Sequence, residues 1–294
     1  MSKAIGELSQ QSHGFWYSHR FLILRRASQL SILALFLLGP VFGVWIMRGN
    51  LSSSEILSTV PLTDPYVFLQ LLASGHIPEA NAIIGVLIVV AFYLLVGGRV
   101  FCSWVCPVNM VTDLAAWLRR KLSINSHTVL SKNIRHLLLA VTLITPLFVG
   151  IVAWELINPV SLFHRGIIFG IGYGGAVILA IFLLDLFVVR QGWCGHICPM
   201  GSLYRVINTG AVLRVNAINR DKCTDCGECF QICPEPQVLK QPLKRKNREQ
   251  NLSSPMISMP DCTNCGRCID VCEPKVIEFT TRFSKTAHIK VNTY

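Results

Sequence analysis

Apolar residues are concentrated in four long runs before about residue 190, and the remainder of the chain is polar. The runs extend over Leu30–Met47, Ala82–Phe101, Leu137–Trp154 and Ile167–Val189. A helix needs about 20 predominantly apolar residues to cross the hydrocarbon layer of a bilayer, and each run approaches that length. The pattern therefore predicts four transmembrane helices.

Basic residues flank these runs in a regular alternation. Lys and Arg gather before the first run, between the second and third, and after the fourth, whereas the other two loops carry only Arg48 and Arg165. Because positively charged loops stay on the cytoplasmic side of a membrane, we expect a multi-pass protein with both termini in the cytoplasm.

Composition agrees with a membrane protein and suggests a division into domains. Of the 294 residues, 52% are hydrophobic and only 15% are charged, which is too apolar for an ordinary soluble protein. We expect a cytoplasmic N-terminal segment at 1–27, a four-helix membrane domain at 28–215 and a small cytoplasmic domain at 216–294. The expected fold class is mainly α-helical, with two repeated transmembrane hairpins followed by a small α+β domain.

Twelve cysteines occupy four compact motifs, and two of these motifs, in the polar tail, have the spacing C-x2-C-x2-C-x3-C. This run holds [4Fe-4S] clusters in bacterial-type ferredoxins, where the fourth cysteine binds the other cluster. A reducing cytoplasm favours metal thiolates over disulfides, and zinc sites usually show two separated C-x2-C pairs instead. The spacing predicts one cluster on Cys223, Cys226, Cys229 and Cys272, and a second on Cys262, Cys265, Cys268 and Cys233.

The other four cysteines form two C-x3-C-P motifs that follow the second and fourth apolar runs. The motifs contain Cys102 and Cys106, and Cys194 and Cys198, and each reads aromatic, Cys, two variable residues, aliphatic, Cys, Pro. The membrane domain is therefore expected to be two copies of a two-helix unit. Three roles are open for these thiols: a further metal or cluster site, a redox or metal-transfer pair, or packing of helix ends against the tail domain.

The order of these parts resembles a known family. The stretches Gly98–Pro107, Gly192–Pro199 and Val60–Pro65 are similar to the membrane-bound, ferredoxin-type quinol dehydrogenase subunit of the periplasmic nitrate reductase system, the NapH family. The similarity covers nearly the whole chain. It implies a bacterial inner-membrane subunit that takes part in quinol oxidation and passes electrons toward periplasmic nitrate reductase.

The resemblance also implies partners, which are a membrane-anchored multihaem cytochrome, a periplasmic iron–sulfur subunit and the quinone pool. Such a subunit is a component of an electron-transfer chain rather than a stand-alone enzyme. Related membrane ferredoxins share the cysteine pattern, among them a methylamine-utilisation protein. The alternative function is therefore a membrane ferredoxin that acts as a redox or metal maturation factor for another respiratory enzyme.

Three further residues are weak catalytic candidates. Asp185 lies in the fourth run, where an ionisable group is a functional candidate by default, although it could instead pair with Arg190. His164 would suit proton transfer because its ordinary pKa is near 6.5, or it could belong to an interfacial anchor. His196 lies between two cysteines, but the matching Ser103 and Trp104 of the first motif offer no histidine.

The formal net charge of +11 comes partly from the flanking basic residues and partly from a basic loop between the two ferredoxin motifs. That loop is either simply solvated or docks on anionic lipid or an acidic partner. Nucleic-acid binding is not expected, because no recognised fold or aromatic pattern accompanies the basic residues. The loop contains Lys240, Lys244, Arg245, Lys246 and Arg248.

Overall fold

The structure is a computed structural model that describes residues 5–124, 130–170, 172–243 and 255–284. It is mostly helical and divides into two compact units. The cysteine-rich unit comprises 1–27, 93–103 and 205–294, and the helical unit comprises 28–92 and 104–204. Four residues of the predicted basic loop, Lys244 to Arg248, lie outside the described residues. The predicted domains at 1–27, 28–215 and 216–294 are continuous stretches of sequence, whereas each compact unit combines separate stretches. The predicted boundaries therefore stay a prediction.

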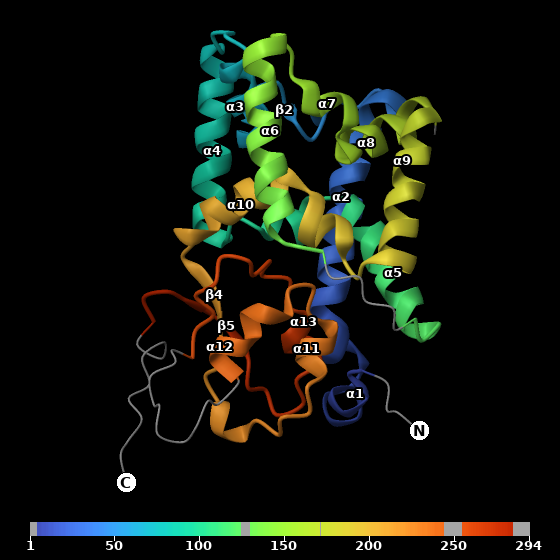
Figure 1. The fold of residues 1–294 in the computed structure, drawn as a ribbon, viewed down its shortest axis with the longest axis vertical. Coiled ribbons are helices and arrows are strands. Elements are labelled where there is room, and N and C mark those ends of the chain that lie inside the picture. Colours follow the sequence, from blue (N-terminus) through green and yellow to red (C-terminus); the bar gives the residue numbers. More distant parts are fainter. Residues whose placement is uncertain (1–4, 125–129, 171, 244–254, 285–294) are drawn as a thin grey trace. The chain divides into compact units, whose positions relative to one another are not determined.

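The helical unit contains most of the apolar helices (Figure 1). Most of α2 (Phe15–Phe42) and most of α4 (Ala80–Val96) belong to this unit. The other apolar helices are α6 (Asn133–Val149), α8 (Pro159–Phe169) and α9 (Gly172–Leu183). Helix α9 continues into the π-helix η2 (Leu184–Val188). Shorter helices are α3 (Pro65–Ala73), α5 (Val108–Lys121) and α7 (Ala153–Ile157). In this unit α3 packs against α6, and α9 packs against both α5 and α8.

A small antiparallel sheet follows α2 in the helical unit. Its strands are β1 (Met47–Gly49), β2 (Ser53–Ile56) and β3 (Val60–Thr63), in that spatial order. Asp64 follows β3 and caps α3, because its carboxylate accepts a hydrogen bond from the Tyr66 backbone N–H at 2.9 Å.

The apolar runs form helices, but glycine shifts their ends from the predicted positions. The first three runs stop at Gly43, Gly97 and Gly150, which all have positive φ and leave the helical conformation. The predicted fourth run, Ile167–Val189, is not one helix, because α8 ends at Gly170 with φ 102° and α9 begins at Gly172.

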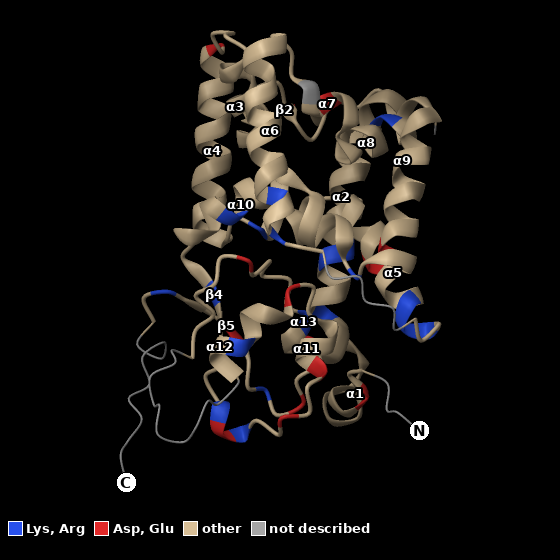
Figure 2. Cartoon of the chain, viewed as in Figure 1, with Lys and Arg blue, Asp and Glu red and all other residues tan. Residues whose placement is uncertain are grey.

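Among the described residues, α2 is the one helix that is both long and apolar enough to cross a membrane. The apolar helices α4 and α6 each have 17 residues, and α9 with η2 is also short. Figure 2 shows that α4 and α9 carry no charged side chains. The structure therefore supports one membrane-crossing helix by length, and the prediction of four is not confirmed.

The cysteine-rich unit has a small α+β core. Strand β4 (Leu213–Asn216) pairs antiparallel with β5 (Glu278–Thr281), and this pairing brings the start of the first ferredoxin motif close to the end of the second. The short helices are α11 (Glu228–Ile232), α12 (Lys240–Leu243) and α13 (Arg267–Asp270), with 3₁₀ turns η4 (Arg220–Lys222) and η5 (Pro236–Leu239). Apolar side chains such as Val215, Leu239 and Ile277 pack around the cysteines.

The N-terminal segment is part of the cysteine-rich unit. Helix α1 (Glu7–His13) and the first turns of α2 pack on the second ferredoxin motif, where Ser9 donates a hydrogen bond to the Asp270 carbonyl at 2.7 Å. The Asp270 carboxylate accepts from the backbone N–H groups of Phe21 and Leu22, at 3.2 and 3.1 Å. The described residues 5–27 thus form a structural part of the core around the cysteines.

Candidate iron-sulfur sites and membrane cysteine motifs

The two ferredoxin motifs have the same local backbone conformation. In each, the third and fifth positions adopt a left-handed conformation, at Asp225 and Gly227 in the first motif and at Asn264 and Gly266 in the second. A short helix, α11 or α13, begins directly after the glycine and carries the third cysteine. The two left-handed residues turn the backbone sharply between the first and third cysteines of each motif.

The structure gathers the first predicted thiol set in one place. Burial, followed by the nearby sulfurs of Cys226, Cys272 and Cys223, raises the pKa of Cys229 to about 12. Burial likewise raises the pKa of Cys272, which lies near Cys223 and Cys226, while its sulfur accepts a hydrogen bond from the Val276 N–H at 3.3 Å. Cys272 therefore lies with the cysteines of the first motif, although it belongs to the second.

The second predicted set is equally close-packed and lines a cavity. Burial raises the pKa of Cys268 well above its ordinary value, and Cys265, Cys233 and Cys262 add to the effect. The cavity is bounded by all four of these cysteines and by apolar side chains that include Val215, Val238 and Ile257.

The chemistry of each thiol set fits an iron–sulfur cluster, which four thiolates hold. The thiols need a common positive centre to become thiolates, because their burial and mutual proximity raise every pKa that is resolved among them. Within the described part of the chain, no group of three or more His, Cys, Asp or Glu side chains has the geometry that holds one metal ion.

The two thiol sets differ in exposure and in neighbouring charge. Cys226 of the first set is exposed, whereas Cys233, Cys265 and Cys268 of the second are buried. The carboxylate of Asp225 lies near Cys223 and raises its pKa, after the larger effect of burial. Around the second set, buried arginines take the place of this acidic neighbour.

Three arginines lie beside the second set. Arg214 and Arg99 lower the pKa of Cys262, although burial raises that pKa overall to about 12. Arg267 acts in the same direction on Cys233, against a larger effect of burial. Arg99 and Arg214 are each 1% exposed, so solvent screens neither charge well.

The C-x3-C-P motifs have matching local structures. Each begins as a five-residue π-helix, η1 (Phe101–Val105) or η3 (Trp193–Ile197), and a new α-helix follows at the proline. The helix boundary expected at proline is present in both, with α5 after Pro107 and α10 (Pro199–Thr209) starting at Pro199. Short π-helical turns of this kind are frequent at functional sites.

The four cysteines of these motifs do not all belong to one unit. Cys102 lies in the cysteine-rich unit, while Cys106, Cys194 and Cys198 lie in the helical unit. In the helical unit, the Cys194 sulfur is 3.7 Å from the Thr112 hydroxyl oxygen. The proposed additional metal or redox site at these cysteines stays a prediction.

Asp185 holds the second membrane motif in position. It is 1% exposed in η2, and its Oδ1 accepts a hydrogen bond from the Trp193 N–H at 3.0 Å. The sequence suggested Arg190 as its cationic partner, but the structure places Arg119 of α5 there, and Arg119 donates to the Asp185 carbonyl at 3.2 Å. Asp185 thus anchors the turn that carries Cys194.

The two histidine candidates have different surroundings. His164 is 3% exposed and lies edge-on to Phe36, with ring centroids 5.0 Å apart. Burial, followed by the nearby Arg165, lowers the pKa of His164. His196 lies within η3 and is partly buried. A catalytic role for Asp185, His164 or His196 stays a prediction.

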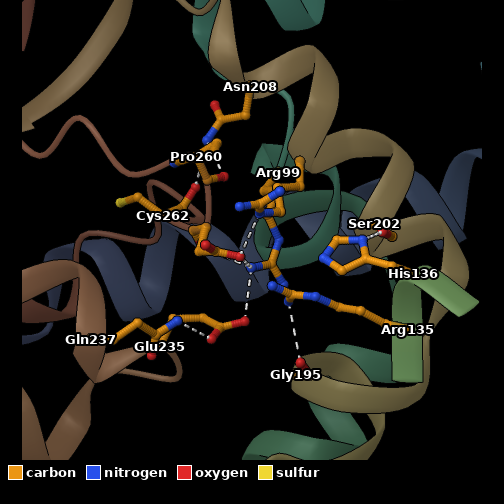
Figure 3. Close-up of polar contacts among 12 residues, drawn as sticks. Arg99, Arg135, His136, Gly195, Ser202, Asn208, Glu235, Gln237, Pro260 and Cys262 are labelled. Carbon is orange, nitrogen blue, oxygen red and sulfur yellow. Dashed lines mark hydrogen bonds and ion pairs between the residues drawn. The ribbon is translucent and has the colours of Figure 1, made fainter. Parts of the chain in front are cut away.

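Sequence reasoning missed Arg99 and its partners. Arg99 Nη1 donates to Glu235 Oε1 at 2.8 Å and to the Asp261 carbonyl at 2.7 Å, within the cysteine-rich unit (Figure 3). A signal was present, because Glu235 and Asp261 are acidic residues beside Cys233 and Cys262 in an otherwise basic chain. Arg99 itself lies in the stretch Gly98–Pro107 that carries the family resemblance, but nothing in its local sequence indicates its acidic partners.

Comparisons with known families match all four cysteine motifs. A family model described as a 4Fe-4S binding domain matches residues 80–125 and again residues 171–216, around the two C-x3-C-P motifs. A second model, described as a 4Fe-4S dicluster domain, matches residues 216–274. No solved structure matches the chain.

Several curated proteins are similar over most of their length. The chain is 48% identical to "Ferredoxin-type protein NapH" of Haemophilus influenzae, over 96% of each chain. It is 51% identical to the protein of that name from Escherichia coli, over 81% of this chain and 83% of the relative. It is also 49% identical to "Methylamine utilization ferredoxin-type protein MauN" of Methylorubrum extorquens, over 79% of this chain and 80% of the relative.

Proposed function

The chain belongs to the NapH family of ferredoxin-type proteins, and from this we propose that it is a membrane electron-transfer subunit that takes part in quinol oxidation. It would pass electrons toward a periplasmic nitrate reductase through a multihaem cytochrome, a periplasmic iron–sulfur subunit, or both. The observation that carries the proposal is that two complete sets of cluster thiols share one chain with helices whose apolar side chains are exposed.

The ligand sets proposed are those that the spacing predicts. The first comprises Cys223, Cys226, Cys229 and Cys272, and the second Cys262, Cys265, Cys268 and Cys233. Oxidation of one quinol to the quinone releases two electrons and two protons, and two one-electron carriers in one chain can hold both electrons.

We further propose that four helices cross the bacterial inner membrane, with both termini in the cytoplasm. The outer faces of α4, α6 and α9 are apolar, with exposed Leu87, Phe148 and Leu179 among them. A contiguous exposed apolar surface of this kind is unfavourable in water and favourable in lipid. Seventeen residues lie at the lower limit for a membrane-spanning helix, so α4 and α6 would cross with little tilt.

The identity of the electron acceptor is a separate part of the proposal. The chain is almost equally similar to the NapH and MauN proteins, at 48–51% and 49% identity in the three comparisons above. This favours a second candidate function, in which the chain supplies electrons for maturation of another enzyme. The thiols that would take part are Cys102, Cys106, Cys194 and Cys198.

The test begins with anaerobically purified full-length protein. We expect about eight irons and eight sulfides per chain, since two cubane clusters hold four of each. A short-chain quinol, added to membranes that contain the native partners, should then produce the electron paramagnetic resonance signals of reduced clusters. If dithionite produces these signals and quinol never does, quinol oxidation is refuted.

A variant with all four C-x3-C-P cysteines replaced by alanine separates the two candidate functions. The electron-transfer proposal expects quinol-dependent reduction of the ferredoxin clusters to continue. The maturation proposal expects that the partner enzyme loses its cofactor while these clusters still form. Retained cofactor in the partner enzyme would exclude maturation through these thiols.

A further inference from the structure

Arg99 lies in a buried ionic network beside the second thiol set. Its guanidinium contacts Glu235 at 2.8 Å and the Asp261 carbonyl at 2.7 Å, and Asp261 Oδ1 lies 3.8 Å away. The exposed fractions of Arg99, Glu235 and Asp261 are 1%, 2% and 4%. Figure 3 shows the Glu235 carboxylate directed at the Arg99 guanidinium.

Each member of this network lies within three residues of a cysteine in the sequence. Glu235 comes two residues after Cys233, Asp261 directly precedes Cys262, and Arg99 comes three residues before Cys102. The Arg99 charge interacts with the sulfurs of both Cys262 and Cys102. Arg99 therefore interacts electrostatically both with Cys262 of the second ferredoxin set and with Cys102, the first cysteine of a membrane motif.

The backbone around Arg99 is fixed to the second ferredoxin motif by neutral hydrogen bonds. Asn208 accepts from the Gly98 N–H at 3.0 Å and donates to the carbonyls of Pro260 and Cys262, at 2.8 and 3.0 Å. Ser103 donates to the Thr263 carbonyl at 2.7 Å. Since these bonds hold the segment on both sides of Arg99, the position of its charge does not depend on the ion pair alone.

Burial and charge have opposite effects on a cluster at this site. Adding an electron makes the cluster and its thiolates more negative, and burial disfavours that state because water is excluded. A nearby fixed cation stabilises the reduced state and raises the reduction potential. The second set is the more buried one. It has Arg99, Arg214 and Arg267 beside it, as well as the carboxylates of Glu235 and Asp261, whereas the first set has exposed Cys226 and the carboxylate of Asp225.

We propose that Arg99 is a positioning residue that sets the reduction potential of the cluster held by Cys233, Cys262, Cys265 and Cys268. The guanidinium keeps that cluster the higher in potential of the two, so that electrons collect at the end of the cysteine-rich unit nearest Cys102. This inference rests on the proposed function for its physiological meaning, but not for its measurement.

The test is an anaerobic redox titration of the purified holoprotein, followed by electron paramagnetic resonance. In Arg99→Gln we expect the reduced-to-oxidised ratio of the second cluster to fall at least tenfold at a fixed ambient potential, which corresponds to about 59 mV for one electron. Cys226→Ser identifies the signals, since it changes a ligand of the first cluster only. Arg99→Lys keeps the charge and should shift the midpoint less.

Arg205→Gln is the matched control. Arg205 contacts the same Asp261 carboxylate at 3.0 Å, but its side chain is 32% exposed, so solvent screens its charge. We expect its midpoints to equal those of the wild type. A shift as large as that of Arg99→Gln would show that the ion network acts as a whole, and would overturn the specific assignment to Arg99.

Glu235→Gln is a second variant, to be used if Arg99→Gln does not assemble its clusters. It removes a buried negative charge while Arg99 remains, so the midpoint of the second cluster should rise. An unchanged midpoint of the second cluster in Glu235→Gln would refute the proposal. These titrations use chemical mediators, so they remain informative even if quinol proves not to be the electron donor.

Discussion

Replacement of Asn208 by alanine tests how the cysteine-rich unit is held together. The side chain is 1% exposed and makes three hydrogen bonds, to the Gly98 N–H and to the carbonyls of Pro260 and Cys262. Each such bond contributes about 1 kcal/mol net, and alanine would leave all three backbone groups without this partner. The expected loss is therefore about 3 kcal/mol of local stability.

Hydrogen exchange measured by mass spectrometry is a suitable assay for this loss. A tenfold change in an equilibrium constant corresponds to about 1.4 kcal/mol, so the segment around Gly98 should open roughly a hundredfold more often. Thr209→Ala is the matched control, because its exposed hydroxyl bonds only to the Val206 carbonyl of the same helix. Equal exchange of the Gly98 segment in Asn208→Ala and wild type would refute this account of the unit.

Three further predictions concern other parts of the chain. Gly266→Ala should lose the second cluster, since the φ of Gly266 is +73° and a Cβ there would lie 2.3 Å from Phe21 Cγ. Gly227→Ala is the matched control, because Gly227 has φ +77° but open space around it, and this variant should lose only about 1–2 kcal/mol of stability. Equal iron content in the two variants would contradict this prediction. Burial raises the pKa of Asp64 to about 7 from 3.8, so its contribution to stability is present below about pH 4 and is lost as the pH rises through 7. Thermal unfolding against pH should therefore be flatter in Asp64→Asn than in wild type, and parallel curves would exclude this titration. Lastly, labelling with a membrane-impermeant maleimide in intact spheroplasts should fail at single cysteines placed in 1–27 or at the C-terminus, and efficient labelling there would contradict cytoplasmic termini.

Much of the candidate site follows from local sequence. Ligand spacing fixes which cysteines one loop can present, and in the structure Cys272 lies near the first motif and Cys233 near the second. The duplicated turns follow from residue type as well, since Gly227 and Gly266 occupy left-handed positions. Helix location was predictable from apolar runs, because moving apolar side chains out of water is favourable whether they enter a protein core or the lipid.

Helix ends and the partners of charged residues were less predictable. The fourth run is broken at Gly170 by a backbone conformation that the apolar pattern does not reveal. Pairing with Arg190 was one alternative for Asp185, and the structure places Arg119 beside it because α5 packs against η2. The helix break is a matter of local backbone conformation, whereas the contact of Arg119 with Asp185 joins residues far apart in the chain.

Sequence by itself determined the cysteine motifs, the apolar helices and the membership of the family, because each of these is written in short-range spacing and composition. Tertiary structure decided that residues 1–27 and 93–103 belong to the same compact unit as the ferredoxin motifs. It also decided that Arg99 faces Glu235 rather than water. The physical reason is that a buried charge requires a partner of opposite sign. The partner of Arg99 is Glu235, 136 positions away in the sequence, and only the folded chain brings the two together.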